Sequence, residues 1–309
     1  MNGTAARFED IQVRGRWTRD EPMSKHTSWR CGGAADYFFE PVDRDDLVAF
    51  YPFSASLPPL MWLGLGSNML VRDGRLERTV VSTSRGLNQI RWLAPDLLYA
   101  EVGVPCAKLA RLCAQADRAG LEFLAGIPGT LGGALAMNAG AHGGEIWDYV
   151  AAVDLIGNNG DIDRYEQSSF SPAYRSVSGP GLDFVGAWLS LPDSAEGHGP
   201  DRIRAILAER SRTQPTGQAS CGSVFVNPAG DFAGRLIEQC GLKGYRLGGA
   251  MVSDIHANFI VNCGDATADD VEALINHVRA VVRQRCGVSL ETEVRIVGNP
   301  PAQSTGVIQ

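Results

Sequence analysis

Apolar and polar positions recur with two different periods along the chain, and the changes of period predict a mixture of strands and helices. Residues 35–39 are rich in aromatic side chains, which favours a strand, and Asp43 follows as an N-cap for an amphipathic helix. Further strands are predicted at residues 60–63, 79–82, 87–93, 97–102, 150–156, 183–191, 259–261 and 290–297, and further helices at 105–120, 201–210, 232–239 and 267–287.

Two of the segments that could be extended carry polar residues in a regular pattern. If residues 220–228 are extended, Ser223 and Asn227 point to the same face. In the alternating segment 290–297, Glu293 lies on the face opposite Leu290 and Val294, so a strand would present its carboxylate. Two simpler interpretations stay open: a serine that only caps or turns the chain, and a solvated strand face.

The stretch from Glu122 to Ile146 has the composition of a binding loop. Seven glycines remove β-carbons along it, and no lysine or arginine lies between Arg118 and Arg164. An anion bound here would therefore depend on backbone N–H groups and helix dipoles, as a pyrophosphate can. The pattern predicts a dinucleotide site, and the alternative is a glycine-rich turn that binds nothing.

A second glycine turn follows the predicted strand at 60–63, with the sequence Gly64-Leu65-Gly66-Ser67-Asn68. Its short side chains could approach phosphate oxygens without crowding them. The dinucleotide motif G-x-G-x-x-G is incomplete, because Met69 stands where the third glycine is required. The doubly wound nucleotide-binding fold is therefore disfavoured.

The composition excludes several classes of protein. With 309 residues, 44% of them hydrophobic and 20% charged, the chain is long enough for two or three domains, and it is not disordered or fibrous. A formal net charge of -7 argues against nucleic-acid binding. Seven cysteines without a C-x-x-C pair predict neither a disulfide framework nor a metal site. The N-terminal segment has no apolar signal region and no apolar run could span a membrane, so we expect a cytoplasmic protein.

Two basic residues in the C-terminal part have ambiguous roles. Lys243 lies in a glycine-containing loop and could meet a phosphate, although a solvated surface charge is the simpler interpretation. A single histidine such as His256, just before a predicted strand, is more often structural than a ligand.

Several motifs together resemble the UDP-N-acetylenolpyruvoylglucosamine reductase family. The similarity lies in GIPGTLGGALAMNAGAHGGEI and LGLGSN, which resemble its flavin-binding signature, and in HTSWRCGGAADYF, AYRS, SCGSVFVNP and LETEVRIVG, which follow in the family's order. The resemblance covers about residues 22–298 and matches the form that lacks an extra tyrosine-bearing loop.

The resemblance implies an α+β protein with an FAD-binding domain of the vanillyl-alcohol-oxidase (PCMH) type in two lobes. We expect an N-terminal arm at residues 1–20, the FAD-binding domain at 21–195 with its lobes divided near 84, and a C-terminal substrate-binding α+β domain at 196–309. The family uses NADPH to reduce FAD, and then reduces the enolpyruvyl group of the UDP sugar to give UDP-N-acetylmuramate for peptidoglycan synthesis. We expect no nucleic-acid, membrane or obligate protein partner.

The resemblance also implies the site residues. Ser223 would protonate the carbon next to the substrate carboxylate, and Arg175 and Glu293 would polarise that carboxylate. Asn227, Lys243 and His256 would lie near the substrate. FAD would be held by Gly64, Gly66, Ser67, Asn68, Met69, Gly126, Pro128, Gly129, Thr130, Gly132, Gly133, Asn138, Gly140, Ala141, Gly143 and Ile146.

The chain departs from the family pattern at two positions close to the proposed acid. Val226 stands where the family often has lysine, and Cys221 where it often has alanine. Two other functions stay open: a different FAD-dependent oxidoreductase, and a nucleotide-binding protein without catalysis. The colour of the purified protein, and its bleaching by NADPH, would separate these hypotheses.

Overall fold

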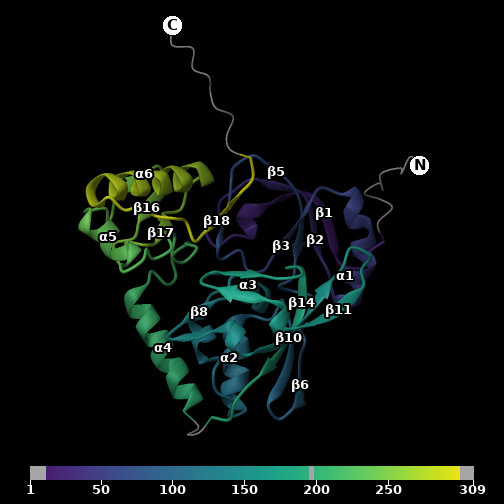
Figure 1. Cartoon of the computed structure of the whole chain (residues 1–309). Coiled ribbons are helices and arrows are strands. Elements are labelled where there is room, and N and C mark those ends of the chain that lie inside the picture. The colour runs from purple at the N-terminus through teal and green to yellow at the C-terminus, as the bar shows by residue number, and fades with distance from the viewer. Residues whose placement is uncertain (1–11, 195–197, 300–309) are drawn as a thin grey trace. The chain divides into compact units, whose positions relative to one another are not determined.

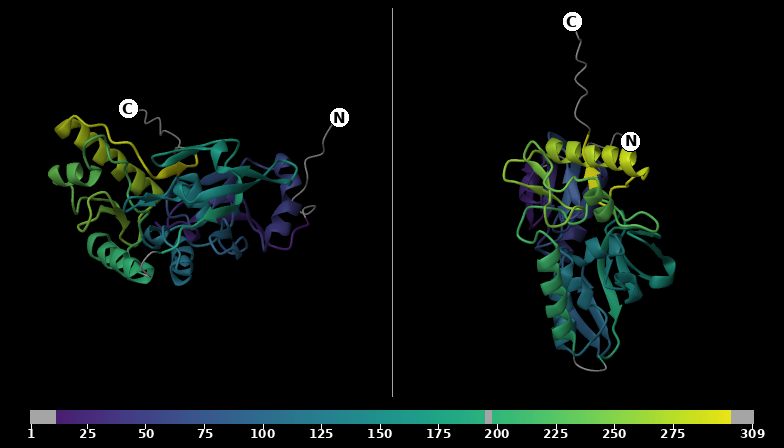
Figure 2. Two further views of the ribbon diagram at one scale, coloured as in Figure 1. Left: turned by 60° about the horizontal axis from the view of Figure 1, so that its bottom comes forward. Right: turned by 90° about the vertical axis from the view of Figure 1, so that its left-hand side faces the viewer.

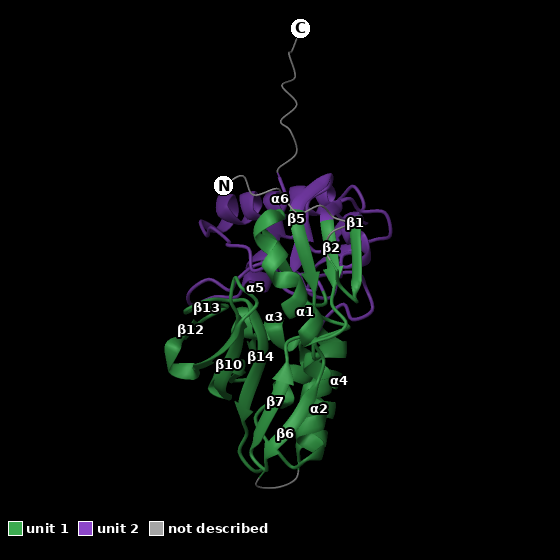
Figure 3. Ribbon diagram, turned by 90° about the vertical axis from the view of Figure 1, so that its right-hand side faces the viewer, with its two compact units in different colours: residues 1–19, 37–65, 78–213 green, residues 20–36, 66–77, 214–309 purple. Residues whose placement is uncertain are grey.

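The structure is a computed structural model that describes residues 12–194 and 198–299. Strands and helices are mixed along the chain, as the periodicity predicts (Figure 1). The described residues form two compact units. Unit 1 comprises residues 12–19, 37–65, 78–194 and 198–213, and unit 2 comprises residues 20–36, 66–77 and 214–299 (Figure 3). Within the described residues, no helix is both long and apolar enough to cross a membrane.

Unit 1 contains a five-stranded antiparallel sheet in the order β11-β10-β14-β7-β6. Helices α2 and α4 pack against each other and against the short 3-10 helix η4 (Figure 1). One apolar core joins these elements, with Leu109, Leu124 and Val153 fully buried in it. The elements are β6 (Ile90–Ala94), β7 (Leu97–Glu101), α2 (Cys106–Gln115), η4 (Glu122–Gly126), β10 (Val150–Ile156), β11 (Ile162–Glu166), β14 (Phe184–Ser190) and α4 (Gly199–Thr213).

Smaller elements of unit 1 lie within the glycine stretch and in the segment that follows it. They are α3 (Leu131–Ala136), β8 (Gly140–Ala141), β9 (Gly144–Glu145), η5 (Ile146–Asp148), η6 (Gln167–Ser169), β12 (Ser171–Ala173) and β13 (Ser176–Ser178). The strands β8 and β9 pair with each other, and β12 and β13 form a second short hairpin.

A four-stranded sheet has the order β1-β2-β5-β3, and three of its strands contain residues of both units. These strands are β1 (Arg16–Pro22), β2 (Ala34–Glu40) and β5 (Arg75–Ser82), and β5 pairs in parallel with β3 (Leu60–Leu63). Helix α1 (Arg44–Phe50) begins as predicted, because the Asp43 carboxylate accepts a hydrogen bond from Asp46 N at 2.9 Å. The helix continues into the 3-10 helix η3 (Tyr51–Ser56).

Unit 2 is built on the long helix α6 (Ala268–Cys286), the yellow helix in Figure 2. This helix packs against β15 and β16. It begins at the start of the predicted helix with a capping box, in which Thr267 and Asp270 exchange side-chain to backbone hydrogen bonds. Gly287 ends it with φ of 70°. The other elements are η2 (Met23–Lys25), β4 (Met69–Val71), α5 (Ala233–Gln239), β15 (Arg246–Leu247), β16 (Ala250–Val252), β17 (Ile260–Asn262) and β18 (Arg295–Val297).

The N-terminal segment 20–36 belongs to unit 2 because Trp29 is buried there. Trp29 Nε1 donates to the carbonyl of Ile260 at 2.7 Å, and Asn262 Nδ2 donates to the carbonyl of Trp29 at 2.8 Å. The fully buried indole therefore joins segments that are 231 positions apart in sequence.

The observed elements differ from the predicted ones in several places, of which these are the main ones. Residues 16–20 of the expected N-terminal arm form part of β1, whereas residues 1–11 lie outside the described residues. The helix predicted at 105–120 ends at Gln115. Only residues 295–297 of the segment 290–297 form a regular strand. The last boundary between the compact units along the chain lies between Thr213 and Gln214, whereas we expected a domain boundary between residues 195 and 196. Segments 20–36 and 66–77, expected in the FAD-binding domain, belong to unit 2.

Candidate active site

The glycine stretch of unit 1 is attached to the chain that leaves β7. Gly129 accepts a hydrogen bond from Cys106 N at 2.9 Å, while Leu131 N and Gly132 N donate to the carbonyls of Val104 and Val102, both at 2.8 Å. A β-carbon on Gly132 would lie 2.9 Å from that of Val102, which is too close for an unperturbed contact. Glycine is needed at this position because two backbone segments pack tightly.

Other glycines of the stretch face open space. A β-carbon on Gly133 would meet only Thr130 Oγ1 at 4.0 Å, and one on Gly143 would meet no atom within 4 Å. Both residues are exposed, whereas Thr130, which lies near Gly133, is buried. The missing β-carbon of Gly133 therefore leaves room for a ligand against the backbone, as a dinucleotide site requires. Gly143 is open as well, and its φ of 85° also favours glycine in the turn between β8 and β9.

Gly64, like Gly132, is a glycine at a position where two segments pack tightly. A β-carbon there would lie 2.4 Å from Thr130 Oγ1, so Gly64 allows the 60–65 segment to reach the glycine stretch. In unit 2, a β-carbon on Gly66 would overlap the carbonyl oxygen of His26 at 1.9 Å. Gly66 also has a positive φ of 60°. The two glycines of the predicted second turn thus have packing roles whether or not a ligand is present.

Asn138 is a buried polar residue at the centre of the glycine stretch. Its Nδ2 donates to Glu145 Oε2 at 2.7 Å and to the carbonyl of Ala173 at 3.2 Å. Its Oδ1 is buried and accepts no hydrogen bond from the described residues. A buried acceptor of this kind costs stability unless a donor reaches it, so the site suits a ligand with an N–H or O–H group.

Arg175 lies beside the same stretch. It occupies the turn between β12 and β13 with φ of 56°, and its Nη1 donates to the carbonyl of Gly140 at 3.2 Å. The Tyr174 ring lies 5.0 Å from the guanidinium carbon. The hairpin is held by the contact of Ala173 with Asn138, so unit 1 brings the predicted arginine and the predicted cofactor stretch together.

Unit 2 brings Ser223 and Glu293 onto adjoining segments. Glu293 N donates to the carbonyl of Val224 at 2.8 Å, and Val226 N donates to the carbonyl of Glu291 at 2.9 Å. Glu293 precedes β18 rather than lying within a regular strand, which corrects the expected strand presentation. These backbone bonds pair the segment that follows Ser223 with the segment that carries Glu293.

Asn258 holds the segment that carries Ser223, and the sequence analysis did not identify it. Its side chain accepts from Phe225 N at 3.0 Å and donates to the Phe225 carbonyl at 2.8 Å, and its own carbonyl accepts from Val224 N at 2.8 Å. Asn258 is only 3% exposed. Its sequence signal was a polar residue between two apolar ones, Ala257 and Phe259, which indicates a buried asparagine with hydrogen-bond partners.

Asn68 supports the segment that carries Glu293, as Asn258 supports the segment that carries Ser223. Its Nδ2 donates to the carbonyl of Glu293 at 3.3 Å, and its own carbonyl accepts from Arg295 N at 3.1 Å. The residue predicted to contact phosphate thus orders the segment that carries the carboxylate. Asparagines therefore fix the backbone near each of the three predicted catalytic residues.

Cys221 has a structural explanation that its sequence position did not suggest. Its Sγ is buried and lies 3.3 Å from the carbonyl of Met69 and 3.6 Å from that of Gly66. Burial raises the pKa of the Cys221 thiol to about 12. The thiol is a protonated donor that joins the segment before Ser223 to the turn at residues 66–69.

The three predicted substrate residues of unit 2 differ in their surroundings. Asn227 accepts a hydrogen bond from Ala233 N at 3.0 Å and so holds the start of α5. Lys243 Nζ pairs with Glu238 at 2.9 Å. His256 Nδ1 accepts from Asn258 N at 3.2 Å, and burial, with a contribution from Lys243, lowers the pKa of the imidazole.

The remaining predicted cofactor residues lie on the same two segments. Ile146 is buried at the start of η5 and Pro128 is exposed, while Gly126, Gly140 and Ala141 are partly exposed in unit 1. Ser67 and Met69 are partly exposed in the turn of unit 2.

Comparisons with known proteins match both parts of the chain. A family model described as FAD binding domain matches residues 35–165, and one described as UDP-N-acetylenolpyruvoylglucosamine reductase, C-terminal domain, matches residues 214–297. The UDP-N-acetylenolpyruvoylglucosamine reductase of Methylococcus capsulatus is 56% identical over 290 residues, which are 94% of this chain and 95% of that protein. The protein of the same name from Nitrosococcus oceani is 50% identical over 301 residues, or 97% of this chain and 100% of that one.

A solved structure agrees with these sequence matches. The crystal structure of UDP-N-acetylenolpyruvylglucosamine reductase from Thermus caldophilus matches with a TM-score of 0.78 and 31% sequence identity. The match covers 93% of this chain and 100% of that chain.

Proposed function

The chain belongs to the UDP-N-acetylenolpyruvoylglucosamine reductase family, and we propose how its own residues perform the family's reaction. It is an FAD-dependent oxidoreductase of α+β fold that reduces UDP-N-acetylglucosamine enolpyruvate to UDP-N-acetylmuramate in peptidoglycan precursor synthesis. NADPH is the reductant. The observation that supports our assignment of residues is the backbone hydrogen bond from Glu293 N to the carbonyl of Val224, which directly follows Ser223.

The glycine stretch has the properties that an FAD site requires. Bound FAD supplies the hydride transfer between NADPH and the enolpyruvyl double bond. Gly133 and Gly143 leave space against the backbone, and the buried Asn138 Oδ1 offers an acceptor to a cofactor donor. Because residues 119–163 contain no lysine or arginine, this stretch itself can offer the diphosphate only backbone N–H groups and short polar side chains.

Arg175 is proposed to bind the substrate carboxylate. An arginine offers two parallel N–H donors to a carboxylate and keeps its charge throughout the reaction. Negative charge increases on the enolpyruvyl carboxylate as hydride is added, so this contact strengthens in the transition state. The contact of Arg175 with Gly140 would orient the guanidinium before the substrate arrives.

Ser223 is proposed to donate the proton to the carbon next to the carboxylate. A serine hydroxyl is a weak acid in water, so its competence depends on its placement over that carbon. The hydrogen bonds of Asn258 to Phe225 hold the segment and would restrict the hydroxyl's position. Glu293, on the adjoining segment, would polarise the same carboxylate by sharing a proton with it.

The UDP sugar needs further contacts beyond the reacting carboxylate. Asn227, Lys243 and His256 are proposed to contact the UDP sugar, since all three lie in unit 2 with Ser223. We propose a cytoplasmic location, which the absence of a disulfide framework in the sequence supports.

The test separates the two half-reactions by stopped-flow absorbance. We expect Ser223→Ala to be bleached by NADPH at nearly the wild-type rate and to recover its flavin absorbance at least about 100-fold more slowly with the UDP sugar. Ser220→Ala, a substitution in the same segment, should behave like wild type in both steps. Equal slowing of both steps in Ser223→Ala would refute the proposed acid.

Two further outcomes would identify the alternative functions. Bleaching by NADPH without recovery on addition of the UDP sugar to the wild-type protein would indicate a different flavin oxidoreductase. A colourless protein that takes up no FAD would indicate a nucleotide-binding protein without catalysis.

A further inference from the structure

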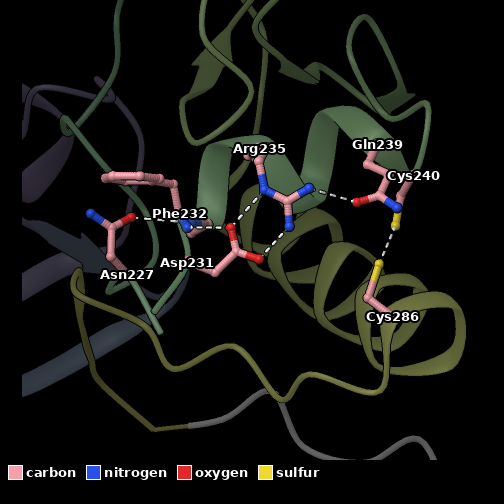
Figure 4. A network of polar contacts seen from close by, with 8 residues as sticks. Asn227, Asp231, Phe232, Arg235, Gln239, Cys240 and Cys286 are labelled. Carbon is pink, nitrogen blue, oxygen red and sulfur yellow. Dashed lines mark hydrogen bonds and ion pairs between the residues drawn. The ribbon is translucent and has the colours of Figure 1, made fainter. Parts of the chain in front are cut away.

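The thiols of Cys240 and Cys286 form a close pair outside the residues assigned to the reaction. Cys240 directly follows α5 and Cys286 is the last residue of α6, and their Sγ atoms are 3.6 Å apart (Figure 4). Both helices belong to unit 2. A disulfide requires about 2.05 Å between the sulfurs, so a small approach of the two helix ends is enough to form one.

The two thiols differ in access. Cys286 is partly exposed, whereas Cys240 is 3% exposed. Burial, followed by the contact with Cys286, raises the pKa of the Cys240 thiol, and the nearby Arg285 opposes this shift. Cys286 is therefore the thiol that an oxidant reaches first.

We propose that Cys240 and Cys286 form a reversible disulfide by exchange with a low-molecular-weight disulfide such as oxidised glutathione. The Cys286 sulfur attacks one sulfur of the oxidant and releases the first glutathione thiol. Cys240 then attacks the Cys286 sulfur of this mixed disulfide and releases the second. Two protein thiols are oxidised, one glutathione disulfide is reduced, and the protons of the protein thiols end on the two glutathione molecules.

The position of the pair connects it with the proposed site through α5. At the other end of this helix, Ala233 N donates to Asn227 Oδ1 at 3.0 Å. Arg235, between the two ends, pairs with Asp231 and donates to Gln239 Oε1 at 3.0 Å (Figure 4). Because α5 has only seven residues, a displacement at Cys240 moves the whole helix. On the proposed function, the disulfide therefore raises the KM for the UDP sugar and leaves reduction by NADPH unchanged.

The bond is tested by incubating the FAD-loaded protein with oxidised glutathione, alkylating it under denaturing conditions and mapping its peptides by mass spectrometry. We expect a cross-link between the peptides of Cys240 and Cys286, a loss of these two titratable thiols, and full recovery with dithiothreitol. Cys263 is exposed and serves as the internal control, since it should form only a mixed disulfide with glutathione. Cys263→Ser should keep the cross-link, and Cys286→Ser should lose it.

Two results would overturn the disulfide. In the first, Cys263 carries glutathione while Cys286 stays a thiol or a mixed disulfide. In the second, a different pair such as Cys31 and Cys221 is cross-linked. A second measurement is thermal unfolding: the oxidised wild type should melt at least about 5 °C above its reduced form, because the bond closes a long loop, and Cys286→Ser should show no such difference.

The effect on the reaction is measured separately. Oxidised wild type should show a several-fold higher KM for the UDP sugar than the reduced protein, and Cys286→Ser should show no change with oxidant. An unchanged KM in fully cross-linked protein would refute the coupling through α5. Failure of the Ser223→Ala test would refute the proposed acid but would leave the peptide map unaffected.

Discussion

Replacing Asn258 by alanine removes the side chain that holds the segment after Ser223. Two hydrogen bonds are lost, one from Phe225 N at 3.0 Å and one to the Phe225 carbonyl at 2.8 Å. Phe225 is 1% exposed, so water does not easily replace the missing partner. Leaving a buried polar group unsatisfied costs about 1–3 kcal/mol, and the two groups together give about 2–6 kcal/mol of lost unfolding free energy.

Urea unfolding of the FAD-loaded protein, followed by circular dichroism, measures this loss. The matched control is Asn88→Ala, because Asn88 is exposed and makes one hydrogen bond to the Arg85 carbonyl at 2.9 Å. The control should change the unfolding free energy by less than about 0.5 kcal/mol. If Asn258→Ala lost less than about 1 kcal/mol, the assignment of Asn258 as the main support of this segment would be refuted.

The substitution Asn258→Asp tests the donor by itself. An ionised aspartate can accept from Phe225 N but cannot donate to the Phe225 carbonyl, so it should destabilise the protein at neutral pH. Burial would raise the pKa of the introduced carboxyl above its unfolded value. Protonation then restores a donor, so the variant should regain stability relative to wild type as the pH falls. A deficit that does not depend on pH would contradict this account.

Three other predictions follow from the site. Gly133→Ala should fold at least as stably as wild type, since its β-carbon meets only Thr130 Oγ1 at 4.0 Å, but it should contain less FAD after purification. Gly64→Ala, whose β-carbon would lie 2.4 Å from the same oxygen, should instead lose stability. Equal FAD content in Gly133→Ala and wild type would contradict the placement of the cofactor. Because the pKa of His256 is lowered in the folded protein, the unfolded state binds the proton more readily. The stability contributed by the neutral imidazole is therefore complete above pH 6.5 and is lost as the pH falls through the lower folded-state pKa. The urea midpoint of His256→Gln should fall less over this range than that of wild type. Arg175→Lys keeps the charge but loses the paired donors, so recovery of flavin absorbance with the UDP sugar should slow by roughly 100-fold while bleaching by NADPH is retained, and an equal effect on both steps would count against carboxylate binding.

Most of the regular elements could be predicted from the sequence because their signals are local. The capping box at Thr267 and Asp270, the N-cap at Asp43 and the glycine that ends α6 all involve neighbours in sequence. The glycine stretch was likewise recognisable, because a high density of glycine is costly unless the backbone must come close to another group. The alternating pattern drew attention to Ser223 and Glu293, but their catalytic roles, and the choice of Arg175, followed from the family resemblance.

Tertiary structure decided which segments share a unit and what holds the proposed catalytic residues. Trp29 packs against a carbonyl 231 positions away, and Asn68 reaches Glu293 across 225 positions. Single hydrogen bonds of this kind contribute about 1 kcal/mol each and leave no periodic signal in the sequence. The same holds for the approach of Cys240 to Cys286, which depends on the packing of two helix ends. Sequence alone therefore determined the local elements and the family, and the long-range packing determined how the site residues are positioned.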